Sequence, residues 1–174
     1  MTKIKVKLFD SNYPLVIRQE GDWIDLYTTK DIRISGPEVY INEDDTKPKR
    51  RRKVIFHTNL AELGVAMQLP EGYEAHVLPR SSTFKNFKVL LTNSQGIIDE
   101  AFRGDNDVWK FGMVALEDTV IPAHSRVAQF RIVLSQKATV WQKIKWLFSN
   151  GISIEYVDSL GNKDRGGIGS TGVS

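Results

Sequence analysis

The chain has 174 residues, of which 41% are hydrophobic, and it carries a formal net charge of +3. This length and apolar content are enough for one domain with a core and give no reason to expect a second domain. The absence of cysteine excludes disulfides, zinc–thiolate sites, iron–sulfur clusters and cysteine nucleophiles, and the three histidines stand singly, without the spacing of a transition-metal site.

The N-terminal segment 3–9 alternates lysines with Ile4, Val6 and Leu8, a period of two that predicts a strand with one solvent-exposed face. The same alternation is unlike the apolar segment of a signal peptide. No window approaches the roughly 20 apolar residues that a membrane helix needs. We therefore expect a soluble, cytoplasmic protein with no membrane partner.

Further short strands are predicted at 13–18, 23–28 and 31–34, where apolar runs are separated by turn residues. Asp25 lies inside the second of these runs, in the sequence GDWIDLYTT. A carboxylate at such a position needs either a polar partner or a wet cleft. A structural and a functional role are both compatible with it.

Residues 38–41 and 54–57 are rich in β-formers and flank the charged sequence NEDDTKPKRRRK. This pattern predicts a hairpin whose long solvated tip, 42–53, is an insertion on a compact domain. Segment 43–53 holds six basic and three acidic residues, so it carries the whole net charge and leaves the rest neutral. A nucleic-acid face spread over the fold is therefore not indicated, although the basic run by itself also resembles a localisation or nucleic-acid tract.

Segments 63–70 and 73–79 predict a second hairpin, which leads the chain to the sequence PRSST at 79–83. An arginine followed by three hydroxyls, just past a strand end, can form an anion cradle because guanidinium, hydroxyls and backbone N–H groups all donate hydrogen bonds. A plain polar turn is the alternative.

The sequence NSQGIIDEAFRGDND at 93–107, which follows a strand at 87–93, predicts a tight hairpin with Asp99 and Glu100 near its bend. An exposed hairpin backbone can read a flat polar ring, while a neighbouring carboxylate activates water. Alternatively, Asp99 only caps its own backbone.

Strands are also predicted at 108–116, 126–134 and 152–157. The segment 139–148 is the one predicted helix, because its large apolar residues recur with a helical period. We expect this helix to cover the core, with a partner-docking or membrane-surface role as the alternative. The glycine-rich tail 161–174 is typical of a frayed end, but its N–H groups can also close over a phosphate.

About ten short strands at regular spacing predict an all-β, jelly-roll-like β-barrel with one short helix, although spacing alone does not distinguish a barrel from a sandwich. The sequences GDWIDL, PRSS, GIIDEAFRGD, RVAQF and RGGIGSTG, in this order, resemble the five motifs of the trimeric dUTP diphosphatases, or dUTPases. The resemblance covers nearly all of a single domain, 1–174; the segments 42–53 and 141–151 look like insertions, and 161–174 matches a flexible C-terminal arm.

The resemblance implies a homotrimer of jelly-roll protomers whose active sites are each built from three chains. It also implies an enzyme that hydrolyses dUTP to dUMP and pyrophosphate with Mg²⁺, keeping uracil out of DNA and supplying dUMP for thymidylate synthesis. Asp99 matches the general base, Gln129 the residue that contacts the α-phosphate and holds the water, and Asp25 the acid near the metal's water shell. No metal site built by the protein is expected, because substrate phosphates and water would hold the ion.

The remaining matches are to substrate-binding positions. They are Arg80, Ser81 and Ser82 for the phosphates, Asn93, Gly96 and Ile98 for uracil, Phe102 for deoxyribose, and Arg165, Ile168, Gly169, Ser170 and Thr171 for the arm that folds over a neighbouring subunit's site.

Two positions depart from the family pattern. Phe102 stands where a tyrosine is common, and Ile168 stands where the arm commonly carries an aromatic residue that covers the uracil. Trp109, or a residue of 141–151, is a candidate to cover the base instead. The alternatives to a dUTPase are a dCTP deaminase-like or bifunctional enzyme of the same fold, or a nucleotide-switched regulatory protein that binds nucleic acid or a protein through 47–53 or 141–148.

Overall fold

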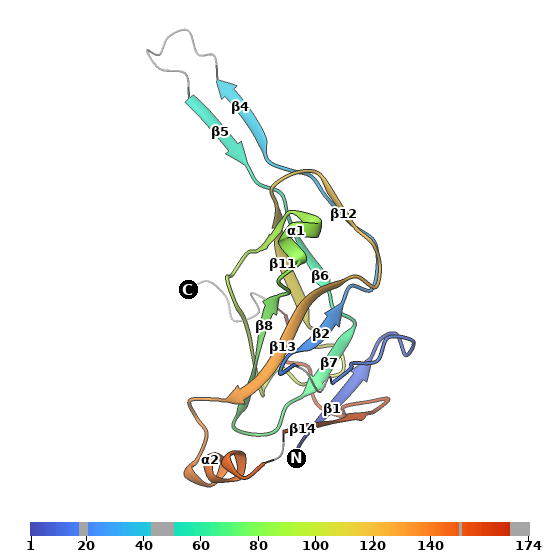
Figure 1. The fold of residues 1–174 in the computed structure, drawn as a ribbon, viewed down its shortest axis with the longest axis vertical. Coiled ribbons are helices and arrows are strands. Elements are labelled where there is room, and N and C mark those ends of the chain that lie inside the picture. Colours follow the sequence, from blue (N-terminus) through green and yellow to red (C-terminus); the bar gives the residue numbers. More distant parts are fainter. Residues whose placement is uncertain (18–20, 43–50, 150, 168–174) are drawn as a thin grey trace.

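The computed structural model describes residues 1–17, 21–42, 51–149 and 151–167. As predicted, it consists mainly of short strands (Figure 1). The strand predicted at 13–18 is wrong, because residues 13–17 form no strand. Their bounds are β1 Thr2–Leu8, β2 Ile24–Tyr27, β3 Ile32–Ile34, β4 Glu38–Asn42, β5 Arg51–Ile55, β6 Thr58–Glu62, β7 Val65–Gln68, β8 Tyr73–Pro79, β9 Val89–Leu91, β10 Gly96–Asp99, β11 Lys110–Ala115, β12 Thr119–Ile121, β13 Arg126–Leu134 and β14 Ile152–Tyr156. Two helices accompany them, α1 Thr83–Phe87 and α2 Val140–Leu147.

A four-stranded sheet in the order β10-β8-β13-β2 carries five of the predicted site residues, namely Asp25, Gly96, Ile98, Asp99 and Gln129. Its two central strands pair antiparallel over seven residues, from Ala128 opposite Pro79 to Leu134 opposite Tyr73. Alternate side chains of β8 are buried, which is the expected result of a period-two strand with one face on the core. The other sheets have the orders β14-β1-β7, β6-β11-β9, β12-β3 and β4-β5, so the described strands do not close into a single barrel.

The core is centred on aromatic side chains that are completely buried. Trp109, Phe111 and Phe130 have no solvent-accessible surface, and the rings of Trp109 and Phe130 meet edge to face at 5.2 Å between centroids. Such rings bury large apolar areas and prefer this tilted arrangement. This packing rules out Trp109 as the residue that covers a base.

Two of the predicted hairpins are wrong. Strand β7 pairs with β1, whereas β8 pairs with β10 and β13, so the turn at 70–72 joins two different sheets. In the segment 93–107, β10 pairs with β8, and the strand that follows, β11, pairs with β6 and β9. Alternation along a chain identifies a strand but not its partner, which tertiary packing selects.

The hairpin of β4 and β5 is confirmed, with Glu38 opposite Ile55 and Asn42 opposite Arg51. Figure 1 shows it projecting from one end of the molecule. Most of the charged tip predicted at 42–53 lies outside the described residues.

Helix α1 was not predicted, because five residues are too few to display a helical period. Helix α2 is confirmed, and it begins with a capping box in which Thr139 and Gln142 satisfy each other's backbone N–H groups. However, none of its residues is buried, and Trp141, Leu147 and Phe148 are each at least 74% exposed. The expectation that it covers the core is therefore wrong, although Trp146 packs against the core at the edge of Tyr73.

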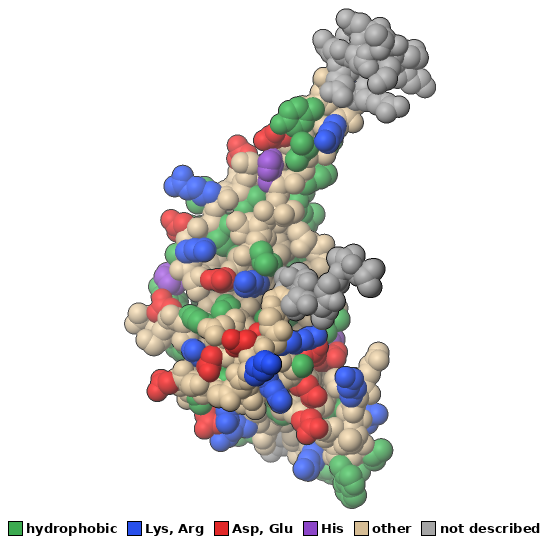
Figure 2. Space-filling model, turned by 180° about the vertical axis from the view of Figure 1, so that it is seen from behind, with side chains coloured by type: hydrophobic (Ala, Val, Ile, Leu, Met, Phe, Trp, Pro, Cys, Tyr) green, Lys and Arg blue, Asp and Glu red, His purple; other side chains and the backbone are tan. Residues whose placement is uncertain are grey.

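The exposed side chains of α2 contribute to the hydrophobic group at the lower end of Figure 2, whereas acidic and basic side chains are interspersed over the body of that face. Among the described residues, no helix is long and apolar enough to cross a membrane.

Candidate active site

A pocket of about 340 Å³ opens beside β10, between the loop that follows this strand and the C-terminal arm. Strand β10 lies at the edge of its sheet, so the outer side of its backbone is not used in the ladder of the described strands. The pocket is lined by Val77, Asn93, Gly96, Ile97, Ile98, Asp99, Phe102, Asn106, Val108, Lys110, Arg165, Gly166 and Gly167. A flat polar ring in this pocket can therefore meet backbone donors and acceptors as well as apolar side chains.

Asp99 ends β10 with its carboxylate half exposed at this pocket. One oxygen, Oδ1, accepts a hydrogen bond of 3.0 Å from the N–H of Ala101, so the residue does cap its own backbone. Both oxygens also accept from one guanidinium nitrogen of Arg165, at 2.9 and 2.8 Å. A local capping bond and a functional position are thus compatible, because the carboxylate has lone pairs for both.

Two residues of the lining set the shape of the pocket. Phe102 is half-buried and packs against the core, which fixes the orientation of its ring. A side chain at position 96 would place its Cβ 3.2 Å from Cβ of Val77, so glycine lets β10 approach β8 closely.

The adjoining residue, Glu100, points away from the pocket lining and accepts a hydrogen bond from the N–H of Gly72. It ties the site loop to the turn beneath α2, because Gln142 of that helix also donates to the carbonyl of Glu71, at 2.9 Å. The second acid of the predicted pair therefore has a structural partner.

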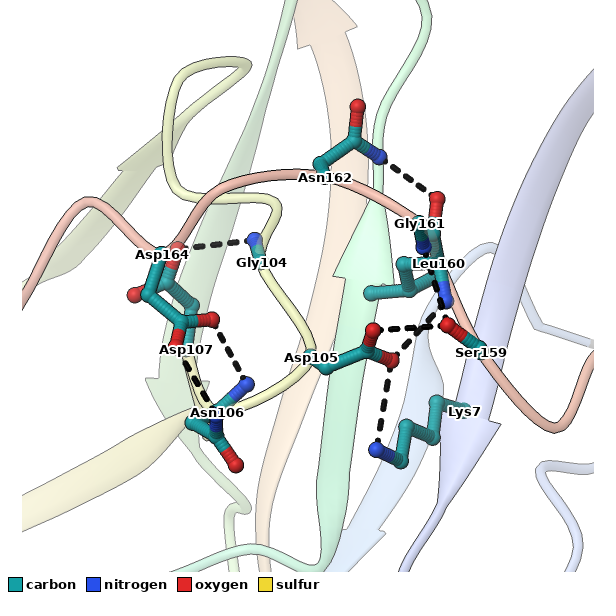
Figure 3. Close-up of polar contacts among 10 residues, drawn as sticks. All are labelled: Lys7, Gly104, Asp105, Asn106, Asp107, Ser159, Leu160, Gly161, Asn162 and Asp164. Carbon is teal, nitrogen blue, oxygen red and sulfur yellow. Dashed lines mark hydrogen bonds and ion pairs between the residues drawn. The ribbon is translucent and has the colours of Figure 1, made fainter.

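Residues 159–167, which lead into the C-terminal arm and form its described part, lie on the loop that follows Asp99. Carboxylates from this segment and from the loop join the two (Figure 3). Asp105 accepts from the N–H of Leu160 at 2.9 Å, from the hydroxyl of Ser159 at 2.7 Å and from the ammonium of Lys7 at 3.2 Å. These contacts lower the pKa of Asp105 from 3.8 to about 2.

Asp164 also joins these two segments, but here the carboxylate belongs to the arm and the donors belong to the loop. Its carboxylate accepts from the side chain of Asn106 at 2.8 Å and from the backbone N–H of Asn106 at 2.9 Å. The two bonds lower the pKa of Asp164 below its ordinary value. Asp107, which is 2% exposed, completes the contact by accepting from backbone N–H groups of both segments.

A second group of predicted site residues lies at the other end of the sheet. Asp25 on β2 forms ion pairs with Arg80, at 2.7 Å, and with Arg126, at 3.2 Å. Gln129 on β13 lies opposite Asp25 in the sheet and approaches the carbonyl of Pro79 at 3.5 Å. A carboxylate inside an apolar strand has thus found the charged partners that it needs.

Two hydrogen bonds to the backbone carbonyl of Val127 hold the sequence PRSST next to Gln129. The carbonyl of Val127 accepts from the N–H of Arg80 at 3.3 Å and from the hydroxyl of Thr83 at 2.7 Å. Ser81 is exposed, and Ser82 precedes α1 without a side-chain bond that caps the helix. Hydrogen bonds at Arg80 and Thr83 therefore hold the two ends of this turn, and Ser81 and Ser82 lie between them, next to Arg80.

A single chain keeps these two groups apart. Asp99 lies opposite Glu74 of β8, and Gln129 lies opposite Leu78 on the other side of the same strand. Four residues along a strand span roughly 13 Å, and two strand spacings add about 10 Å across the sheet. One phosphate group cannot contact both side chains within one chain.

The predicted residues thus fall into three sets. Those at the pocket are Asn93, Gly96, Ile98, Asp99, Phe102 and Arg165; those at the strand ends are Asp25, Arg80, Ser81, Ser82 and Gln129; and Ile168, Gly169, Ser170 and Thr171 lie outside the described residues. Sequence reasoning missed Asn106, Asp107 and Lys110. The only available signal for them was the density of polar residues after Gly104, which is equally typical of a solvated turn.

Together, the fold and the pocket define a β-sheet protein with an edge-strand cleft, a carboxylate at its mouth and a basic arm across it. Comparison with known proteins is more specific: the family model described as dUTPase matches residues 38–169. The chain belongs to the dUTPase family.

Curated relatives agree with this assignment over the full length. The chain is 44% identical over 172 residues to the SPbeta prophage-derived deoxyuridine 5'-triphosphate nucleotidohydrolase YosS of Bacillus subtilis, covering 98% of this chain and 99% of that protein. It is 31% identical over 178 residues to the deoxyuridine 5'-triphosphate nucleotidohydrolase of Anaplasma marginale, covering 99% and 100% of the two chains.

Solved structures agree at the level of the fold. The dUTPase of Streptococcus mutans superimposes with a TM-score of 0.58 at 18% identity, covering 78% of this chain and 98% of that one. A mutant dUTPase from phage phi11 of S. aureus, described with a structural Mg(II) ion, gives 0.56 at 14% identity over 79% and 94% of the two chains. The predicted jelly-roll-like class is confirmed.

Proposed function

We propose that this protein hydrolyses dUTP to dUMP and pyrophosphate, which keeps uracil out of DNA and supplies dUMP for thymidylate synthesis. The observation that carries the proposal is the full-length similarity to a named dUTP nucleotidohydrolase, together with the position of Asp99 at the mouth of the pocket. A deoxyuridine ring fits the chemistry of the lining, because the edge of β10 that no other described strand pairs with offers both donors and acceptors to a pyrimidine.

Asp99 is the general base in this proposal. Its carboxylate orients a water molecule and accepts its proton as the water attacks the α-phosphorus, with pyrophosphate as the leaving group. The guanidinium of Arg165 donates to both oxygens of Asp99. A triphosphate offers the guanidinium a more highly charged partner, which would free the carboxylate for the water.

The rest of the pocket supplies selectivity. Gly96, Ile98 and Asn93 surround the base, and the ring of Phe102 lies under the deoxyribose, where a ribose hydroxyl would not fit. Because Phe102 is held by core contacts, its ring can discriminate by shape without a hydroxyl of its own.

The second group of residues binds the phosphates from a neighbouring subunit. Arg80, Ser81 and Ser82 supply charge and hydroxyl donors, and Gln129 holds the α-phosphate and the attacking water. Since Asp99 and Gln129 are far apart in one chain, a homotrimer with shared sites brings them together, and Arg165, Ser170 and Thr171 of a neighbouring subunit's arm fold over the β- and γ-phosphates.

Mg²⁺ is the proposed cofactor. Among the described residues no group of three or more carboxylates or histidines lies close enough to bind a metal, and the carboxylate of Asp25 is engaged by two arginines. The donors that remain are phosphate oxygens and water, which Mg²⁺ prefers. The ion would neutralise charge on the phosphates, and Asp25 would contact at most its water shell.

The test is a nucleotide panel. Purified protein with Mg²⁺ should release pyrophosphate from dUTP, and much less from dCTP, dTTP and UTP. Asp99→Asn should lower turnover by about 10²- to 10⁴-fold while retaining affinity for dUMP. Asp118→Asn is a matched control, because Asp118 binds the N–H of Gly36 at 2.7 Å and does not line the pocket. Ammonia release from dCTP, or unchanged turnover in Asp99→Asn, would refute the proposal.

A further inference from the structure

Helix α2 presents its apolar side chains to solvent. At about 100° per residue, five of them fall within an arc of about 120° around the helix axis. An ordinary surface helix turns such an arc toward the core, whereas here the arc faces outward. The five side chains, which are between 40% and 80% exposed and which we call the α2 stripe, are Val140, Trp141, Ile144, Leu147 and Phe148.

The opposite side of α2 holds the helix to the body of the protein. Gln142 donates to the carbonyl of Glu71 at 2.9 Å, and the ring of Trp146 meets that of Tyr73 at 5.5 Å between centroids. The capping box at Thr139 completes the first turn without help from another element. These contacts fix the outward orientation of the α2 stripe, so binding through it requires no folding of the helix.

The charges around the α2 stripe are all positive. Segment 135–151 contains three lysines and no acidic residue. Lys143 and Lys145 lie about 40° beyond the two edges of the stripe, one on each side, and Lys137 precedes the helix. All three are exposed, and none forms an ion pair with another described residue. An apolar surface with a lysine along each edge is complementary to a surface that is apolar inside and anionic at its boundary.

The shape and chemistry of the α2 stripe favour a membrane over a protein as this partner. Figure 1 shows α2 at the end of the molecule opposite the β4–β5 hairpin, and the hydrophobic group to which it contributes protrudes in Figure 2. The indole N–H of Trp141 is the one side-chain hydrogen-bonding group in the stripe, whereas protein interfaces use about one hydrogen bond per 100–200 Å². A bilayer interface needs no such pairing, and tryptophan is enriched there.

We propose that α2 attaches this protein to the surface of a membrane rich in anionic phospholipids. The α2 stripe lies at the boundary between headgroups and acyl chains, and Lys143 and Lys145 face the lipid phosphates. Eight residues are too few to span a bilayer, so the attachment is peripheral. This inference goes beyond nucleotide hydrolysis and does not depend on it.

The test is co-sedimentation of the full chain with vesicles of equal parts phosphatidylcholine and phosphatidylglycerol, and with vesicles of phosphatidylcholine alone. The wild type should bind the anionic vesicles more tightly. Trp141→Ser with Phe148→Ser should weaken this binding about tenfold or more, because it removes the two largest rings of the stripe. Lys143→Gln with Lys145→Gln should weaken it by about 5- to 25-fold. All four side chains are exposed, so Tm should change by no more than about 3 °C.

Two matched double variants control for apolar area and for charge. Val39→Ser with Phe56→Ser removes side chains of the β4–β5 hairpin that are more than half exposed, and Lys30→Gln with Lys85→Gln removes the same charge from other exposed positions. Both should bind anionic vesicles within about twofold of the wild type. Losses equal to those of the α2 variants, or a wild type that binds anionic vesicles no better than neutral ones, would overturn the proposal.

Brominated lipids report which tryptophan enters the interface, because they quench fluorescence by contact. Trp141→Phe should bind within about threefold of the wild type but lose most of the quenching, since Trp109 is buried and Trp146 faces the body. Unchanged quenching would show that another surface contacts the lipid and would refute the proposal. Self-association that Trp141→Ser with Phe148→Ser abolishes, without vesicle binding by the wild type, would assign the α2 stripe to a contact between copies and refute it as well.

Discussion

Substitution of Asp25 by asparagine separates two roles that this residue can have. The resemblance to the family predicts a role near the metal's water shell, whereas the structure shows Asp25 in ion pairs with Arg80 and Arg126. The side chain of Asp25 is only 13% exposed, so its carboxylate contacts these two arginines more than it contacts water. Asparagine keeps the size and removes the charge.

The structure sets the expected cost. Each hydrogen bond to a charged group contributes about 1.5–3 kcal/mol when it is shielded, but Arg80 is 26% and Arg126 is 39% exposed, so both guanidinium groups can rehydrate. We therefore expect a loss of about 2 kcal/mol in the free energy of unfolding. For a domain of this size each kcal/mol lowers Tm by about 2–4 °C, which gives a decrease of about 4–8 °C.

The assay combines thermal unfolding with pyrophosphate release at varied Mg²⁺. If Asp25 acts by holding Arg80, Asp25→Asn should lower kcat/KM for dUTP even at saturating Mg²⁺, and Arg126→Gln, which leaves the Arg80 pair intact, should have a smaller effect. An unchanged Tm, or a loss of activity that added Mg²⁺ restores completely, would show that the arginine pairs are not the source of its effect.

Three further predictions concern other parts of the molecule. Trp109→Ala should cost about 3–5 kcal/mol in urea unfolding, and Trp109→Phe clearly less, because the indole N–H has no hydrogen-bond partner among the described residues and phenylalanine keeps an aromatic ring against Phe130; equal costs would contradict this. Arg165→Gln should change stability by less than about 1 kcal/mol, since both members of its pair with Asp99 are over 40% exposed, while dUTP turnover falls severalfold or more; a large decrease in Tm would contradict this. Because the pKa of Asp105 is lowered from 3.8 to about 2, its stabilising contribution is complete above pH 3.8 and is lost as the pH falls towards 2, so Asp105→Asn should flatten the acid limb of the unfolding curve between these values; an unaltered limb would remove Asp105 as its source.

The parts of the fold that local chemistry governs were predicted correctly. Period-two alternation identified β1 and β8, the flanking β-formers identified the hairpin of β4 and β5, and the apolar period identified α2. In each case the signal lies within a few consecutive residues, where backbone geometry and capping act. The motif residues at the pocket and at the strand ends were also found from the sequence, through their resemblance to a family; their individual roles remain predictions.

Long-range choices were not predicted. Neither the partners of β7 and β10 nor the exposure of α2 has a local signature, because they depend on which apolar faces meet in the folded chain. Asp107 is the clearest example: in the sequence it is one more polar residue in a turn, and only the return of the arm brings it the backbone donors of Arg165 and Gly166.

The sequence by itself determined the strands, the capped helix and the chemical types of side chain available for nucleotide hydrolysis, because these depend on short-range periodicity and residue identity. The tertiary structure alone decided that Asp99 and Gln129 lie at opposite ends of one sheet, and that Arg165 returns to Asp99 across 66 residues. Burial and hydrogen bonding between distant segments fix these positions, and a linear pattern of residues does not contain that information.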